Sequence, residues 1–240
     1  MAIKDIVLND GNIIPGLGFG TWQTPDGETV VNAVKWALKT GFRLIDTAVA
    51  YRNETGVGRG LKASGLARDK IFVTTKIQGA TKTYEGAKAE IDGSLERLGL
   101  DYLDLVLIHC PKPWPEFYGI SYKTYDRENL EVWRALEEAR KAGKVRSIGI
   151  SNFGPKATAN IVDHAAVKPA VNQIRYFIGL DSGERPTIDY CKAHGIAVEA
   201  YSPLNTGELL GDARVNALAA KYHKTLPQLA IAYCLNKGLI

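Results

Sequence analysis

Three apolar segments in the first half of the chain each end on a side chain that can take part in acid–base chemistry. The first ends on Asp46, the second on Lys76 and the third on His109, and Tyr51 follows the first in a polar turn. A free phenol has a pKa of about 10, and a cation beside its oxygen lowers that pKa. Lys76 could be this cation, Asp46 could keep it charged, and His109 could hold a substrate oxygen. Together the four would deliver a proton to a carbonyl oxygen, and a cofactor would have to supply the hydride.

Each of these four residues also has a purely structural explanation. An acid after a strand commonly caps the next helix, so Asp46 alone is weak evidence. Lys76 and Asp46 could form a structural ion pair, because a buried ammonium needs a nearby acid. His109 could be a hydrogen-bonded core histidine, and Tyr51 could be a packed aromatic residue. The chemical interpretation therefore depends on all four side chains meeting at one place.

Alternating helical and strand-like segments are predicted to bring these residues to one edge of a sheet. In the helical stretches apolar residues recur three or four positions apart, and each stretch stops at a glycine suited to a left-handed cap: Gly41, Gly65, Gly99, Gly143 and Gly195. Strands are predicted at residues 17–21, 43–47, 71–76, 103–109, 145–150, 170–175 and 196–201. Right-handed crossovers turn this alternation into a parallel sheet whose carboxyl ends share one edge.

The predicted fold is a single α/β domain over residues 1–240, a (β/α)8 TIM barrel with an N-terminal β-hairpin lid. Residues 9–12 supply the hairpin turn. No GxGxxG sequence follows the first predicted strand, which disfavours the two-halved dinucleotide-binding fold. Leu239 and Ile240 have the character of an eighth strand's first residues. We therefore expect the final strand and helix of the barrel to be missing from the chain.

Composition argues against several classes of function. Hydrophobic residues make up 45% of the 240 positions, and the net charge of +4 comes from interspersed acids and bases without a basic run, so we expect no nucleic-acid partner. No apolar run approaches the roughly 18 residues of a membrane span, and no signal peptide opens the sequence. We expect a cytoplasmic monomer that binds no metal. Its three widely spaced cysteines fit free thiols: Cys110, Cys191 and Cys234.

Short motifs along nearly the whole chain resemble those of the aldo-keto reductases, in the same order and each at a predicted strand end. The matching segments are 18–22 (GFGTW), 46–54 (DTAVAYRNE), 74–76 (TTK), 104–111 (DLVLIHCP), 148–153 (IGISNF), 171–173 (VNQ) and 200–204 (AYSPL). So many short matches in order make the resemblance specific. It indicates the bacterial type of reductase that acts on aldehydes and ketones with NADPH.

The resemblance implies a (β/α)8 barrel and a role for each matching residue. The catalytic set would be Asp46, Tyr51, Lys76 and His109, with Tyr51 as the general acid. Ser151, Asn152 and Gln173 would hold the nicotinamide carboxamide, Tyr201 would stack on its ring, and residues 202–207 would follow the pyrophosphate. All residues implied to bind the cofactor are Thr21, Trp22, Asp46, Ser151, Asn152, Gln173, Tyr201, Ser202, Pro203, Leu204, Thr206 and Gly207. Those implied to contact the substrate are Trp22, Tyr51, His109 and Trp114.

The leading hypothesis is reduction of a small-molecule aldehyde or ketone to an alcohol by hydride transfer from NADPH. NADPH rather than NADH is implied by the resemblance alone, because the family's segment for the 2′-phosphate usually lies on the last strand and its loop. Two alternatives remain open. A nucleotide-binding sensor would bind the cofactor without turnover. A metal-dependent hydrolase ranks last, because His109 and Cys110 alternate faces of a strand and cannot both ligate one ion.

Overall fold

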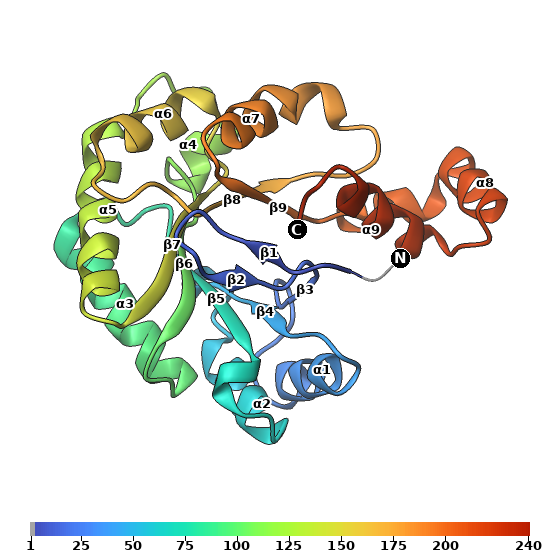
Figure 1. Cartoon of the computed structure of the whole chain (residues 1–240), viewed down its shortest axis with the longest axis horizontal. Coiled ribbons are helices and arrows are strands. Elements are labelled where there is room, and N and C mark those ends of the chain that lie inside the picture. The colour runs from blue at the N-terminus through green and yellow to red at the C-terminus, as the bar shows by residue number, and fades with distance from the viewer. Residues whose placement is uncertain (1–2) are drawn as a thin grey trace.

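Seven parallel strands form the centre of the molecule in a computed structural model, which describes residues 3–240. They are hydrogen-bonded in chain order and curve into a nearly closed barrel with helices outside (Figure 1). Each predicted strand is confirmed, with ends that differ by one residue at most. The strands are β3 (Gly18–Gly20), β4 (Leu44–Asp46), β5 (Phe72–Ile77), β6 (Leu103–Ile108), β7 (Val145–Ser151), β8 (Val171–Arg175) and β9 (Ala197–Tyr201).

Amphipathic helices cover the outer face of this sheet. Val34, Ile91 and Leu136 come from three different helices and pack with Val106 of β6 in one buried cluster, as their spacing predicts. The five predicted cap glycines all have positive φ, which ends each helix in a left-handed turn. The helices are α1 (Glu28–Lys39), α2 (Glu54–Ala63), α3 (Tyr84–Leu98), α4 (Trp114–Tyr118), α5 (Asp126–Lys141), α6 (Pro155–His164), α7 (Asp181–Ala193), α8 (Ala213–Lys221) and α9 (Leu226–Asn236).

The predicted hairpin is formed by β1 (Ile6–Val7) and β2 (Ile13–Ile14), which pair antiparallel. It crosses in front of the parallel strands in Figure 1. Ile14 is fully buried, and the side-chain amide of Asn12 donates to Ser147 Oγ at 3.0 Å, near the start of β7. The hairpin therefore covers the end of the barrel where the strands begin and leaves the carboxyl ends of the strands open.

The first and last strands of the sheet, β3 and β9, are its two edges. Ile240 pairs beside β9: its N–H donates to the Val198 carbonyl at 3.0 Å, and its own carbonyl accepts from the Ala200 N–H at 2.8 Å. Figure 1 shows this end of the chain next to β9. The final residue thus begins to pair with the sheet, as its apolar character predicted.

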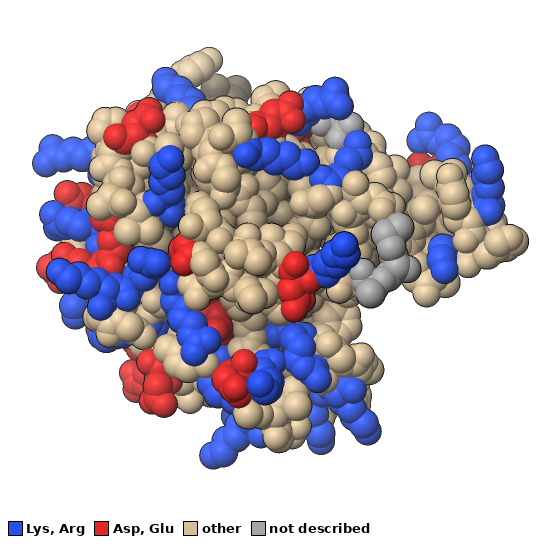
Figure 2. Space-filling model, viewed as in Figure 1, with Lys and Arg blue, Asp and Glu red and all other residues tan. Residues whose placement is uncertain are grey.

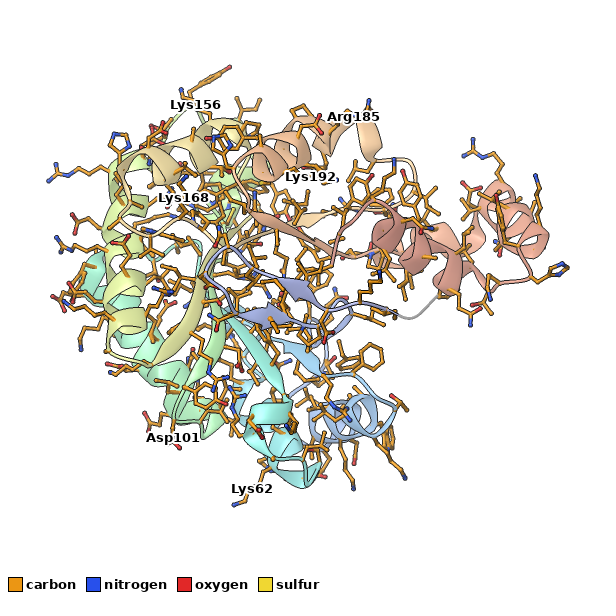
Figure 3. The ribbon with its side chains drawn as sticks, viewed as in Figure 1. Lys62, Asp101, Lys156, Lys168, Arg185 and Lys192 are labelled. Carbon is orange, nitrogen blue, oxygen red and sulfur yellow. The ribbon has the colours of Figure 1, made fainter. Side chains whose placement is uncertain are left out.

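Charged side chains of both signs surround the hairpin end of the molecule. Figure 2 shows Lys, Arg, Asp and Glu mixed around the rim and an uncharged centre over the hairpin. Lys62 on α2 and Lys156 on α6 project outward from the helices in Figure 3. None of the helices within residues 3–240 combines the length and apolarity that a membrane crossing requires.

Candidate active site

Lys76, Asp46 and Tyr51 meet at the carboxyl ends of β4 and β5. Lys76 Nζ donates to the two carboxylate oxygens of Asp46 at 2.5 and 2.7 Å and to the Thr47 carbonyl at 3.0 Å. The Tyr51 hydroxyl lies 3.4 Å from the same nitrogen. Asp46 is paired in register with Thr74, two residues before Lys76, so the period of the strand turns both side chains to one face. A 3₁₀ turn that ends at Tyr51 then brings the phenol over the ammonium.

Burial and charge set the protonation of these groups in opposite directions. Burial lowers the pKa of the Lys76 ammonium, but Asp46 and Tyr51 together outweigh this effect and leave the net pKa above its ordinary value. At Tyr51, burial raises the phenol pKa, and Lys76 offsets only part of the rise. The expected lowering by Lys76 is present, but a net lowered pKa is not, because burial is the larger effect. Tyr51 therefore stays protonated near neutral pH, with a fixed cation beside its oxygen.

His109 follows β6 directly and lies edge-on to Tyr51, with ring centroids 5.6 Å apart. Burial lowers the pKa of His109 to about 3, and the charge of Lys76 acts in the same direction, so the imidazole is neutral at pH 7. Its Nδ1 is buried without a hydrogen-bond partner among the described residues. Nε2 is then the ring nitrogen left for a partner in the cavity. On its other side His109 packs against Trp114, whose indole stacks on Tyr118.

A second polar group joins β7, β8 and β9. Asn152 uses both ends of its amide internally: Oδ1 accepts from the Tyr201 hydroxyl at 2.8 Å, and Nδ2 donates to the His109 carbonyl at 2.9 Å. The Ser151 hydroxyl donates to the Gln173 carbonyl at 2.9 Å. Asn152 also has a left-handed backbone with φ of 62°, which an asparagine tolerates better than most residues. These bonds fix the strand ends on which the polar side chains stand.

A cavity of about 760 Å³ opens over both groups, within the size range of small-molecule sites. Lys76 lies behind its wall. Of the residues implied to bind cofactor, Thr21, Leu204 and Gly207 do not line it, and Thr21 is buried with its hydroxyl bonded to the Asp46 carbonyl. The other residues implied to bind cofactor or substrate all line it: Trp22, Asp46, Tyr51, His109, Trp114, Ser151, Asn152, Gln173, Tyr201, Ser202, Pro203 and Thr206.

Two charged residues near the cavity were not expected. Arg175 lies two residues after Gln173 on β8 and lines the cavity, and its guanidinium donates to Asn205 Oδ1. Glu199 lies two residues before Tyr201 on β9 and is buried. A signal for both was present in the sequence, because alternation along a strand puts residues two apart on the same face. A charge in a strand of otherwise apolar residues could therefore have identified Glu199.

No cluster of three or more His, Cys, Asp or Glu side chains within residues 3–240 is arranged to hold a metal ion. Next to His109, Cys110 is buried as a free thiol, and burial raises its pKa to about 11. The described part of the chain therefore offers no ligand set for the metal-dependent alternative.

Comparisons with known proteins identify the same family along the chain. A model described as the aldo/keto reductase family matches residues 16–239. The chain is 40% identical over 240 residues to the glyoxal reductase of Bacillus subtilis, covering all of this chain and 82% of that protein. It is 36% identical over 238 residues to a 9,11-endoperoxide prostaglandin H2 reductase of Trypanosoma cruzi, covering 98% and 79% of the two chains.

Solved structures agree with this result. An aldo/keto reductase from Brucella melitensis superposes with a TM-score of 0.88 at 38% identity, covering all of this chain and 87% of that one. An aldo-keto reductase of Bombyx mori in complex with NADP gives a TM-score of 0.83 at 34% identity, covering all of this chain and 82% of that one. Because the family match spans nearly the whole chain and the relatives are covered over most of their length, the chain belongs to the aldo/keto reductase family of oxidoreductases.

Proposed function

We propose that the chain reduces aldehyde or ketone carbonyls to alcohols with NADPH, and that Tyr51 is the general acid. One observation carries the proposal: a single buried ammonium, Lys76, contacts both the Asp46 carboxylate and the Tyr51 hydroxyl beneath an open cavity. A structural ion pair alone would account for the first contact but not for a phenol held over the cation at the cavity wall.

The protonation states of Tyr51, Lys76 and His109 explain how a proton would reach the substrate. When a hydride adds to a carbonyl carbon, negative charge develops on the oxygen, and a protonated phenol within hydrogen-bond reach can donate to it. Lys76 would stabilise the phenolate that this donation leaves on Tyr51. His109 is neutral and lines the cavity, and Nε2 is its remaining ring nitrogen, so it would donate a hydrogen bond to the same oxygen and orient it. Asp46 keeps Lys76 charged throughout.

The cavity also fits a nicotinamide nucleotide, which would supply the hydride when bound. Tyr201 offers an aromatic face, Gln173 offers an amide, and Ser202 and Thr206 lie on the same wall. Arg175 adds a positive charge there that suits the pyrophosphate. The NADP complex of the Bombyx mori relative supports the choice of nucleotide.

The proposal is tested by the variant Tyr51→Phe, which removes the proton donor and keeps the ring. Loss of a general acid costs on the order of a hundredfold or more in turnover. NADPH oxidation would be followed by absorbance with a panel of aldehydes, ketones and keto acids. Glyoxal belongs in the panel, because one relative is named a glyoxal reductase.

The matched control is Tyr122→Phe, which removes a phenol that is 94% exposed and does not line the cavity. It should keep full turnover. A Tyr51→Phe protein that turns over as fast as wild type would refute the role of Tyr51. Wild-type protein that binds NADPH but reduces nothing in the panel would favour the sensor alternative.

A further inference from the structure

Glu199 is a buried carboxylate that the proposed proton transfer does not use. Its side chain lies in the middle of β9, and the residue is only 7% exposed. Oε1 accepts a hydrogen bond from Gln173 Nε2 at 2.9 Å, whereas Oε2 is buried without a partner among the described residues. A carboxylate with one oxygen unpaired is costly to bury, so packing alone does not explain an acid here.

Gln173, the hydrogen-bond partner of Glu199, donates to carboxylates on two different strands. Gln173 pairs in register with Glu199 on the neighbouring strand, so both side chains point into the barrel. From across the barrel, Asp46 Oδ2 accepts from the same Gln173 Nε2 at 2.9 Å. A primary amide nitrogen carries two hydrogens, and here each has its own carboxylate oxygen. Lys76 donates to both carboxylate oxygens of Asp46 and keeps that acceptor charged.

This arrangement permits only one orientation of the Gln173 amide. If the amide were rotated by half a turn, Oε1 would face two carboxylate oxygens, with repulsion in place of two charge-assisted hydrogen bonds. Oε1 is therefore directed away from both acids, and it accepts no hydrogen bond from residues 3–240. Gln173 lines the cavity, so this free acceptor is available to a ligand.

The side chains of the two neighbouring candidates are already hydrogen-bonded to other residues. Asn152 Oδ1 already accepts from the Tyr201 hydroxyl, and its Nδ2 is shared between Ser151 and His109. Ser151 Oγ donates to the Gln173 carbonyl and accepts from Asn152. Of the three residues implied to hold a carboxamide, Gln173 alone keeps a side-chain oxygen free of contacts with the described residues.

We propose that Glu199 is a positioning residue, which fixes Gln173 so that Gln173 Oε1 accepts from the NH₂ group of a bound carboxamide. The inference rests on the proposed function, because the carboxamide is that of the nicotinamide. Glu199 acts through Gln173 and does not touch the reacting atoms.

The ionisation of Glu199 does not disturb this role. Burial and the nearby charge of Asp46 raise the pKa of Glu199 to about 7. When the carboxyl is protonated, the proton sits on Oε2, because Oε1 faces the Gln173 N–H. One oxygen thus accepts from Gln173 in either state.

The test compares Glu199→Leu, which removes the acceptor, with Glu199→Gln, which restores one. NADPH binding would be titrated by quenching of tryptophan fluorescence, and thermal unfolding would confirm that each variant is folded. Loss of one hydrogen bond to a charged acceptor should weaken NADPH binding about tenfold in Glu199→Leu. Glu199→Gln should stay within about threefold of wild type, because its side-chain oxygen can accept from the Gln173 N–H.

A double-mutant cycle separates positioning from general damage. In the Gln173→Leu background, Glu199→Leu should weaken binding no further, because nothing remains to be positioned. Equal losses in both backgrounds, or wild-type affinity in Glu199→Leu, would overturn the proposal. So would a Gln173→Leu protein that binds NADPH as tightly as wild type.

A measurement without cofactor distinguishes this inference from the proposed function. The side-chain amide protons of Gln173 should shift in the NMR spectrum of Glu199→Leu relative to wild type, and an unchanged spectrum would contradict the contact. Wild-type protein that does not bind NADPH at all would refute the proposed function. It would also refute the nicotinamide carboxamide as the ligand of Gln173. Wild-type binding that Glu199→Leu leaves unchanged would refute only the role of Glu199.

Discussion

Two carboxylates, the half-buried Asp46 and the buried Asp104, lie near opposite ends of the parallel strands. Asp104 is the second residue of β6, on the side covered by the hairpin, and it is bound by Arg68 at 2.6 Å and by the Val73 N–H at 2.9 Å. Asp46 ends β4 at the open side and is bound by Lys76 and Gln173. Both are acids paired with a base, so their residue types alone do not distinguish a structural pair from a catalytic one.

The difference lies in which partner is buried and what the carboxylate faces. The side chain of Arg68, which binds Asp104, is 24% exposed to solvent, and Asp104 does not line the cavity. At Asp46 the base is fully buried, and the acid lines the cavity. In barrels of this kind the carboxyl ends of strands carry chemistry and the other end carries stability. We therefore expect substitutions at the two acid–base pairs to affect different properties.

The largest effect is expected for Lys76→Met, which removes the cation from the open end. Turnover with NADPH should fall about a hundredfold or more, because the Tyr51 phenolate loses the charge that stabilises it. The measurement is the initial rate of NADPH oxidation per folded molecule. The matched change at the other end is Arg68→Met, which should leave that rate unaltered while lowering the free energy of unfolding. Similar rates for the two variants would mean that both pairs are structural.

The second prediction concerns Asp104→Ala. It leaves the Val73 N–H buried without its acceptor and Arg68 without its carboxylate, so the free energy of unfolding should fall by about 2–4 kcal/mol. Urea unfolding measures this loss, and the NADPH oxidation rate per folded molecule should not change. The predicted difference between the Asp104 and Asp46 ends would be wrong if Asp104→Ala had wild-type stability. It would also be wrong if the variant folded fully but had lost activity.

Most of the barrel could be predicted because each strand carries its own signal. Apolar runs and glycines at helix ends are local features, and both are observed. Local features also placed Asp46, Lys76 and His109 at strand ends, and parallel pairing then brings such ends to one edge. The positions of these three candidate residues at one edge of the sheet were therefore predicted without knowledge of any contact.

The features that the sequence did not predict depend on how deeply a side chain is buried and on contacts between distant strands. The net direction of the Tyr51 pKa required knowledge of how deeply the phenol is buried, which no residue pattern states. The two hydrogen bonds of the Gln173 amide, one to Asp46 on β4 and one to Glu199 on β9, depend on how the sheet curves into a nearly closed barrel. Residue types at Thr21 and Leu204 matched the family, yet these side chains do not line the cavity, because the backbone at each position turns them toward the core.

The third prediction uses pH to sharpen the comparison. The pKa of His109 is lowered to about 3, so below its ordinary value of about 6.5 the unfolded chain binds a proton that the folded chain does not. His109 therefore stabilises the folded chain above its ordinary pKa of about 6.5, and this stabilisation is lost as the pH falls below it. The loss should be about 1.4 kcal/mol for each pH unit between roughly pH 6 and 4. At Asp104 burial raises the pKa, so its contribution has the opposite sign: it is present at low pH and is lost as the pH rises through that pKa.

Urea unfolding of His109→Gln at pH 7, 6 and 5 checks this expectation. The variant should show a flatter dependence of unfolding free energy on pH than wild type. The matched substitution at an exposed position outside the cavity is His164→Gln, which controls for the change of residue type. Equal slopes in wild type and His109→Gln would show that the imidazole titrates in the folded chain much as it does in the unfolded one.

The smallest effect is expected at the hairpin, with Asn12→Ala. The Asn12 side chain donates to Ser147 Oγ at 3.0 Å and to the Arg146 carbonyl at 3.2 Å, and these partners belong to the start of β7. Such bonds between neutral groups are worth about 1 kcal/mol in net stability, and solvent can replace part of the contact on the exposed side. Urea unfolding should therefore show a loss of about 1 kcal/mol, while NADPH affinity and turnover stay at wild-type values, because no residue of the hairpin lines the cavity. A change in turnover in Asn12→Ala would show that the hairpin end and the open end of the barrel are coupled. The assignment of stability to the Asp104 pair and turnover to the Asp46 pair would then be wrong.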